Sequence, residues 1–197
     1  MCGIVGYTGT GQAKDILLEG LKRLEYRGYD SAGIAVFDGD KLNIVKRLGK
    51  VSELVDAVSS DQCSGTCGIG HTRWATPGAP SERNAHPHTS CADDIAVVHN
   101  GIIENFTELR EELIAKGHTF VSDTDTEVAA HLVEEGYNGN LLEAVRYAAS
   151  RLVGAYGLAV TCEQEPGTIV VTRKDSPIVL GSSEKGSYVA SDIIAVI

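Results

Sequence analysis

Long apolar runs and basic clusters are both missing from this 197-residue sequence. No apolar run approaches the ~20 residues that a helix needs to cross a bilayer, and no basic segment followed by an apolar run opens the chain. Lys and Arg number 17 against 27 Asp and Glu, and basic residues never form more than adjacent pairs. We therefore expect a cytoplasmic protein that binds neither membrane nor nucleic acid.

Cysteine is sparse and odd in number, which argues against a disulfide framework. The five cysteines, at positions 2, 63, 67, 91 and 162, fit reduced thiols. A nucleotide-phosphate loop is also excluded, because the glycine-rich segment 6–11 lacks the Gly-Lys-Ser/Thr ending that such loops need.

A metal site has donors in the sequence, but their arrangement is unfavourable. Thiolate and imidazole donors recur at Cys63, Cys67, His71, His86, His88 and Cys91. Cys67 and His71 fall on a predicted strand rather than in a turn, and Cys63 and Cys91 fall in polar loops. We expect no metal and no cofactor, and a zinc-bound structural domain remains the alternative.

The remaining composition fits one globular domain over residues 1–197, with 43% hydrophobic and 22% charged residues. Apolar patterns predict strands over 2–7, 32–37, 42–47, 67–72, 95–99, 156–162, 168–172, 178–181 and 187–191. Asp38-Gly39-Asp40 predicts a hairpin turn. Gly68 and Gly70 leave one strand face nearly flat, as where a backbone or ligand comes close. Runs of strands and runs of helices without strict alternation favour an α+β fold over a parallel doubly wound sheet.

Helices are predicted in the intervening segments. One carries Ile16, Leu17, Leu21 and Leu24 on its buried face and breaks at Gly28. Others are expected from a cap at Ser52 to about Val58, and over 141–152.

Two further helix starts show capping-box spacing. Asn105 with Glu108, and Thr124 with Glu127, stand three residues apart, which lets an N-cap side chain and a carboxylate satisfy each other's exposed amides. The first of these helices is expected to bury Leu109 and Leu113 and to end at Gly117.

Cys2 is the residue with the clearest potential chemistry. Cysteine is small enough that trimming of Met1 is expected, which leaves a thiol and a free α-amine on one residue. The amine titrates near ~8 and the thiol near ~8.5, so the amine can serve as the base for its own nucleophile. The alternative is a small apolar residue that opens a buried strand.

Polar residues also gather where predicted strands and helices meet. Arg73 and Trp74 follow a strand, where a guanidinium fork suits a carboxylate and an aromatic ring can cover a small ligand. Asn100 and Gly101 follow another strand and offer two donors for an oxyanion, although Asn-Gly is more often a turn. Asp125 stands near a helix start, where helix-dipole complementarity is the simpler interpretation.

Taken together, these motifs resemble one known arrangement. In order they are Cys2-Gly3-Ile4-Val5-Gly6, Glu25-Tyr26-Arg27-Gly28-Tyr29-Asp30-Ser31-Ala32-Gly33, His71-Thr72-Arg73-Trp74-Ala75-Thr76, Asn84-Ala85-His86-Pro87-His88, His99-Asn100-Gly101-Ile102-Ile103-Glu104-Asn105 and Thr124-Asp125-Thr126-Glu127. Over nearly the whole chain they resemble the glutaminase domain of class II glutamine amidotransferases. Tyr-Arg-Gly-Tyr-Asp-Ser is similar to the glutamine:fructose-6-phosphate aminotransferase branch rather than to the phosphoribosyl-pyrophosphate amidotransferases.

The resemblance implies a four-layer αββα sandwich of the N-terminal nucleophile hydrolase type. It implies that Cys2 attacks the side-chain amide of L-glutamine, and that Asn100 and Gly101 hold the oxyanion. The remaining implied roles are substrate binding by Arg73, Asp125 and Thr76, support of the Cys2 terminus by Arg27, and gating of ammonia by Trp74.

Two departures from the family pattern are visible. Pro77 stands where many relatives have His, so position 77 offers neither an imidazole nor a backbone N–H. We expect that this chain lacks the sugar-phosphate isomerase domain of the family enzymes, and that oligomers form only through that domain. A non-catalytic glutamine-binding regulatory module, or another class II amidotransferase, remains the alternative.

Overall fold

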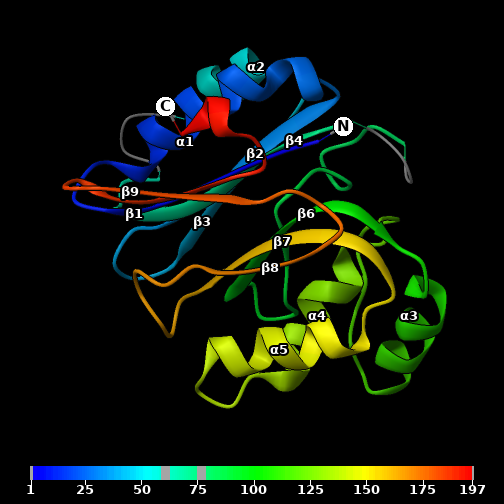
Figure 1. Cartoon of the computed structure of the whole chain (residues 1–197). Helices are drawn as coiled ribbons and strands as arrows, with labels where there is room; N and C mark the ends of the chain where they lie inside the picture. Colours follow the sequence, from blue (N-terminus) through cyan, green and yellow to red (C-terminus); the bar gives the residue numbers. More distant parts are fainter. Residues whose placement is uncertain (1, 59–62, 75–78, 197) are drawn as a thin grey trace.

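Two antiparallel sheets pack face to face in the computed structural model, which describes residues 2–58, 63–74 and 79–196 (Figure 1). The larger sheet contains β1 (Gly3–Gly9), β2 (Ser31–Phe37), β3 (Leu42–Leu48), β4 (Cys67–Arg73), β9 (Val179–Ser183) and β10 (Gly186–Ala190), in the order β3-β2-β4-β1-β10-β9. The smaller contains β5 (His88–Thr89), β6 (Ile95–Ile103), β7 (Gly154–Cys162) and β8 (Val170–Lys174), in that order.

Helices cover the outer face of each sheet (Figure 1). On the larger sheet lie α1 (Ala13–Leu24) and α2 (Val51–Ala57), and on the smaller α3 (Phe106–Ala115), α4 (Glu127–Gly136) and α5 (Leu141–Arg151). Short 3-10 turns, η1 (Glu25–Arg27) and η2 (Ile193–Ala195), complete the chain. The predicted αββα sandwich is confirmed.

Three apolar clusters hold the four layers together. One lies between α1, α2 and the larger sheet, and another between α3, α4, α5 and the smaller sheet. The third joins the two sheets through Ile4, Ala35, Leu42, Ile69, Ala96, Val98 and Ala159. Alanines are frequent in this middle cluster, so the inner faces of the sheets can approach each other closely.

Helix α1 occupies the flat strand face that the glycines of β4 create. A Cβ atom on Gly68 would lie 3.0 Å from Leu17 Cδ1, and one on Gly70 would lie 3.1 Å from Leu21 Cδ1. The close approach predicted from these glycines is therefore present, and the approaching groups are leucine side chains of α1 rather than a ligand.

The predicted helices form, but their predicted N-terminal caps are wrong. Ser52 lies inside α2, and the exposed N–H of Val51 is satisfied instead by Glu25 Oε1 at 2.7 Å. Asn105 precedes α3 without capping it, because its side chain bonds the backbone of Arg151 and Val153. In each case a partner distant in sequence replaces the local one.

The second capping box is also replaced. Helix α4 begins at Glu127 after Thr126, and the Glu127 carboxylate accepts backbone N–H bonds from Val121 and Ser122, both at 2.7 Å. Thr124 pairs instead with the ring of His88 at 3.0 Å. The carboxylate thus fixes the segment before the helix rather than its first turn.

The C-terminus of α3 follows the prediction. Gly117 has φ +103°, its N–H donates to Ile114 O, and the N–H of His118 donates to Leu113 O, both at 3.0 Å. This left-handed ending suits glycine because a side chain would be strained there.

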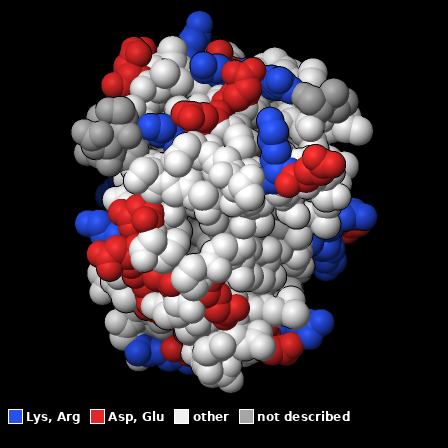
Figure 2. Space-filling view, turned by 90° about the vertical axis from the view of Figure 1, so that its left-hand side faces the viewer, with Lys and Arg blue, Asp and Glu red and all other residues white. Residues whose placement is uncertain are grey.

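Surface charge is mixed on the face shown in Figure 2. Acidic and basic side chains alternate around an uncharged centre, so the described residues form no continuous basic surface on this face. Among the described residues, no helix is both long enough and apolar enough to cross a membrane.

Candidate active site

Cys2 lies at the edge where β1 begins and β4 ends. The two strands pair antiparallel with Gly3 opposite Thr72, which brings Cys2 beside the residues that follow β4. The backbone N–H of Trp74 donates to Cys2 Sγ at 3.2 Å. Burial raises the pKa of the Cys2 thiol, and the Trp74 N–H and the Arg73 charge oppose that rise. A nearby base is therefore needed to produce the thiolate.

Asn100 and Gly101 reach Cys2 from the other sheet. Asn100 Nδ2 donates to the carbonyl oxygen of Cys2 at 3.1 Å. Strand β6 continues past both residues to Ile103, paired with β7, so Asn-Gly is not a turn here. Gly101 has φ +129°, and a Cβ atom there would lie 2.0 Å from Ala155 O, so only glycine fits.

Arg73 and Asp125 place opposite charges in one buried place. They are 3% and 4% exposed and line a hollow of about 20 Å³ together with Cys2 and Gly101. Asp125 Oδ2 accepts the N–H of Ile103 at 2.8 Å. Burial raises the pKa of Asp125 and lowers that of Arg73, while each charge favours the other. The pair is complementary to a zwitterion such as an α-amino acid.

Trp74 lines both this hollow and a larger one. The second hollow, of about 410 Å³, is also lined by Cys2 and Gly101, and by Arg27. The Trp74 ring is 45% exposed and contacts the Tyr29 ring edge-on, with centroids 5.3 Å apart. Cys2 therefore lines both a narrow polar hollow and a wider one.

Arg27 contacts the last strand region. Its Nη1 forms an ion pair with Asp192 at 2.9 Å and donates to Ser191 O at 3.5 Å. Ser191 Oγ in turn accepts the N–H of Ile4 at 2.9 Å. Through Ser191, Arg27 thus contacts the N-terminal strand indirectly. The predicted site residue Thr76 and the unusual Pro77 lie outside the described residues.

Buried histidines lie at the Cys2 site: His86 and His99 line the hollow, and His71 packs against His86. No catalytic role was predicted for any of them from the sequence. His86 Nε2 and His99 Nδ1 both lie 2.9 Å from Thr126 Oγ1, beside Asp125. Burial lowers the pKa of His71 to about 3 and that of His99 to about 4, and it lowers the pKa of His86 well below its usual value. All three rings are neutral at pH 7. In the sequence, the signal that could have indicated a role for these histidines is that each stands within one of the motifs quoted above.

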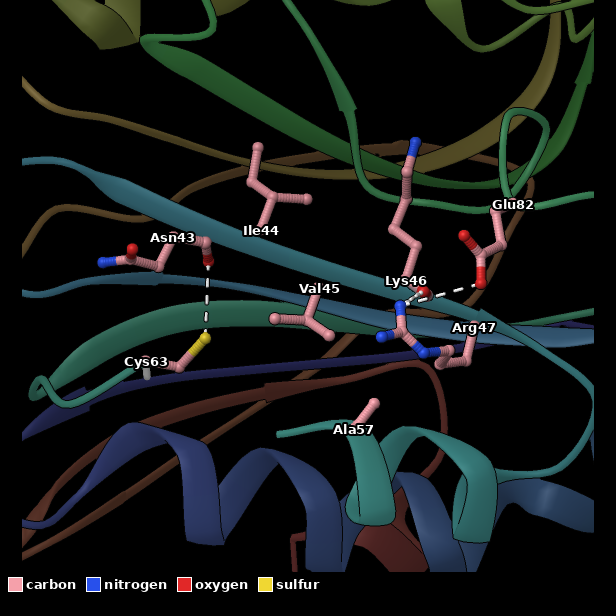
Figure 3. Close-up of a pocket in the computed structure, with 8 residues that line it drawn as sticks. All are labelled: Asn43, Ile44, Val45, Lys46, Arg47, Ala57, Cys63 and Glu82. Carbon is pink, nitrogen blue, oxygen red and sulfur yellow. Dashed lines mark hydrogen bonds and ion pairs between the residues drawn. The ribbon is translucent and has the colours of Figure 1, made fainter. Parts of the chain in front are cut away.

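The metal donors considered from the sequence are not brought together as a set. Cys63 lies beside β3, where its Sγ is 3.8 Å from Asn43 O, at a separate hollow of about 420 Å³ (Figure 3). There Arg47 Nη1 lies 3.6 Å from Glu82 Oε1, and the lining residues include no other thiol and no histidine. His86 lines the hollow at Cys2 instead, and the His71 ring packs against it with centroids 4.1 Å apart.

Comparison with known proteins places these features in a family. Residues 71–197 match the glutamine amidotransferase domain family. The chain is 53% identical to the glutamine–fructose-6-phosphate aminotransferase [isomerizing] of Caldanaerobacter subterraneus subsp. tengcongensis, over 100% of this chain and 32% of that protein. It is 55% identical to the enzyme of the same name from Thermus thermophilus, with the same coverage. The chain thus spans about a third of the length of these relatives.

Solved structures agree on the fold. Glutamine phosphoribosylpyrophosphate amidotransferase from B. subtilis, complexed with ADP and GMP, has a TM-score of 0.85 at 30% identity, over 98% of this chain and 42% of that one. A glutamine aminotransferase class-II domain protein from Silicibacter pomeroyi has a TM-score of 0.64 at 17% identity, over 96% of this chain and 88% of that one, which supports the fold alone.

Proposed function

This chain belongs to the class II glutamine amidotransferase domain family, with the N-terminal nucleophile hydrolase fold, and we propose that it hydrolyses glutamine through a thioester on Cys2. One observation carries the assignment of residues: Asn100 Nδ2 and the Trp74 N–H both donate to Cys2, and Cys2 lines one hollow together with a buried cation, Arg73, and a buried anion, Asp125. A nucleophile, oxyanion donors and groups for a zwitterion therefore converge on one place.

The reaction begins after removal of Met1. The α-amine of Cys2 takes the thiol proton, and the sulfur attacks the side-chain carbonyl carbon of glutamine. Asn100 Nδ2 and the Gly101 N–H donate to the oxygen as it becomes negative. The Cys2 ammonium then protonates the departing nitrogen and the carbon–nitrogen bond breaks. Ammonia departs, and the glutamyl group remains bound to Cys2 as a thioester. Water, deprotonated by the same amine, cleaves the thioester to glutamate and restores the thiol.

Substrate orientation comes from the buried charges. The Arg73 guanidinium binds the α-carboxylate through its planar fork, Asp125 binds the α-ammonium, and Thr76 assists. The hollow between them holds about 20 Å³, room for roughly one water molecule, so glutamine must widen it on binding. That adjustment makes recognition of both α-groups part of forming the reactive complex.

Ammonia leaves past Trp74 into the larger hollow that Arg27 also lines. In the whole protein this ammonia is delivered to a sugar-phosphate isomerase domain and used to make glucosamine 6-phosphate from fructose 6-phosphate, in the cytoplasm. The names and greater length of the relatives support this role. Oligomers form through that second domain.

Labelling with a glutamine-shaped diazo-ketone tests the proposal. We expect the label on Cys2 and on no other cysteine, because only Cys2 combines an activated thiol with a glutamine site. Cys2→Ala should abolish both labelling and glutaminase activity while the circular dichroism spectrum is unchanged, and Cys67→Ala is the matched control that keeps both. Label mainly on Cys91, which is the exposed cysteine, would mean that exposure controls reactivity. Glutamine binding without turnover by the Met1-free chain would favour a regulatory module.

A further inference from the structure

Four side chains with metal-binding atoms converge on one point outside the Cys2 site. Cys91 lies in the turn between β5 and β6, His118 follows α3, and His131 and Glu134 lie one turn apart on α4. One potential ligand atom from each lies within 4.8 Å of all the others. None of the four residues lines either hollow at Cys2.

The distances have the pattern of a tetrahedral site. Cys91 Sγ lies 3.6 Å from the Nδ1 atoms of both His118 and His131. Glu134 Oε2 lies 3.0 Å from Nδ1 of His118 and 3.2 Å from Nδ1 of His131. Zinc bonds of ~2.3 Å to sulfur and ~2.0–2.1 Å to nitrogen or oxygen, at tetrahedral angles, place sulfur and nitrogen roughly 3.6 Å apart and nitrogen and oxygen roughly 3.3 Å apart. The four atoms already stand close to these separations.

The groups around the four ligands orient them. Both imidazoles turn Nδ1 inward, so Nε2 faces outward: that of His118 lies 3.0 Å from Glu135 Oε1, and that of His131 lies 3.7 Å from Glu127 Oε1. Metal-binding histidines usually have a carboxylate hydrogen-bonded to the second ring nitrogen, where it fixes the tautomer; Glu135 lies at that distance from His118, whereas Glu127 lies just beyond it from His131.

Backbone donors support the anionic ligands. The N–H of Thr119 donates to Cys91 Sγ at 3.4 Å, a bond that favours a thiolate. The N–H of Cys91 donates to the Glu134 carboxylate, with 3.1 Å to each oxygen. The thiol and carboxylate are thus held toward the same point that the two rings face.

We propose that Cys91, His118, His131 and Glu134 form a structural zinc site. Their chemistry suits zinc better than calcium or magnesium, because three of the four donors are sulfur or nitrogen. A thiolate and a carboxylate balance the two positive charges of the ion. On binding, the Cys91 thiol proton goes to solvent, and any Nδ1 proton moves to Nε2 or to solvent. Four protein ligands fill the tetrahedron and leave no open position for catalysis.

The site joins three segments of the smaller layer. It connects the β5–β6 turn, the segment after α3, and α4, whose first residue follows Asp125 and Thr126. Zinc therefore stabilises the domain and holds in place the helix that starts beside the substrate-binding carboxylate. The alternative is a metal-free group of hydrogen-bonded histidines and glutamates.

Metal binding to the whole chain distinguishes these possibilities. The chain is treated with chelator, dialysed, and titrated with Zn²⁺ or Co²⁺, and bound metal is measured by elemental analysis. We expect one zinc per chain, a tetrahedral Co²⁺ spectrum with a thiolate charge-transfer band, and a higher melting temperature with zinc. Cys91→Ser should lose the band and at least ~10-fold in zinc affinity. Cys91 is the exposed cysteine, so this variant should fold.

Glu134→Gln should also weaken zinc binding, and Glu108→Gln, an exposed glutamate on α3, is its matched control and should bind as the parent does. Failure of the parent chain to bind zinc, or equal binding and an unchanged cobalt band in Cys91→Ser, would overturn the proposal. Loss of zinc from Glu108→Gln would also contradict it. None of these readouts requires glutaminase activity.

Discussion

The Nε2 atom of His71 lies 3.0 Å from Oδ1 of Asn100 and 2.9 Å from the carbonyl oxygen of His99. Since a carbonyl only accepts, Nε2 must carry the proton, and the neutral ring donates to both oxygens. The Asn100 amide is then oriented with its oxygen toward His71 and its NH₂ toward Cys2. His71 thus determines which end of the amide faces the nucleophile.

We predict that His71→Ala lowers kcat for glutamine roughly 10- to 100-fold, less than the ~10²–10³-fold typical of losing an oxyanion donor outright. KM should change little, because His71 acts on Asn100 and not on the substrate's α-groups. His71→Gln should recover part of the loss, since its amide N–H can also donate. Steady-state kinetics of both variants and of Asn100→Ala provide the test. Normal kcat in His71→Ala beside a defective Asn100→Ala would remove the positioning role.

Much of the fold could be predicted because its signals are local. The apolar runs of the strands, the Asp38-Gly39-Asp40 hairpin and the Gly117 helix ending depend on neighbouring residues. The N-terminal caps could not, because their partners are distant: Glu25 satisfies Val51. The two-residue strand β5 was also missed, because it has too few residues to show alternation.

In the candidate site, too, features with a local signal could be predicted, and features that depend on residues distant in sequence could not. Cys2 and Arg73 could be proposed because each stands at a strand end within a distinctive motif, and Asn100 because of its motif alone, since β6 continues past it. The orientation of Asn100 by His71 depends on two sheets packing together, which no residue spacing reveals. Cys91 was considered with His86 and His88, yet the fold brings it to His118 and His131, which pattern reading along one segment could not anticipate.

The buried histidines predict an acid-sensitive fold. Burial lowers the folded-state pKa of His71 and His88 to about 3 and of His99 to about 4, whereas unfolded histidine titrates near ~6.5. Between these values the unfolded chain binds more protons, so stability is complete above about pH 6.5 and falls as the pH drops toward the folded-state values. Each histidine contributes a slope of up to ~1.4 kcal/mol per pH unit.

Urea unfolding at several pH values between 5 and 7, with chelator in every buffer, measures this slope. Burial raises the pKa of Glu127, but the His131 ring and hydrogen bonds from Ser122 and Val121 outweigh it and lower the pKa to about 2. Glu127 therefore changes the stability only below about pH 4.5, outside that window. His88→Gln should reduce the slope by the contribution of one histidine, up to ~1.4 kcal/mol per pH unit. An equal free energy of unfolding at pH 5 and pH 7 would show that the rings are protonated in the folded chain.

Arg73→Lys should separate charge from geometry in carboxylate recognition. Lysine keeps the positive charge and loses the planar fork, so we expect transition-state stabilisation to fall by ~1–3 kcal/mol, the scale of a charge-assisted hydrogen bond. The measurement is kcat/KM for glutamine, with the exposed Arg146→Lys as control. Unchanged kcat/KM in Arg73→Lys would mean that Arg73 supplies only charge.

Asp125→Asn tests recognition of the substrate's ammonium group. Asparagine keeps an oxygen to accept the N–H of Ile103, so the local fold should survive while the negative charge is lost. Glutamine would then bury its ammonium without a counter-charge, whereas an analogue lacking the α-amine has none to bury. We expect kcat/KM to fall far more for glutamine than for glutaramate, measured in parent and variant. Equal losses on both substrates would reduce Asp125 to a structural carboxylate before α4, and the amine site would have to be sought elsewhere.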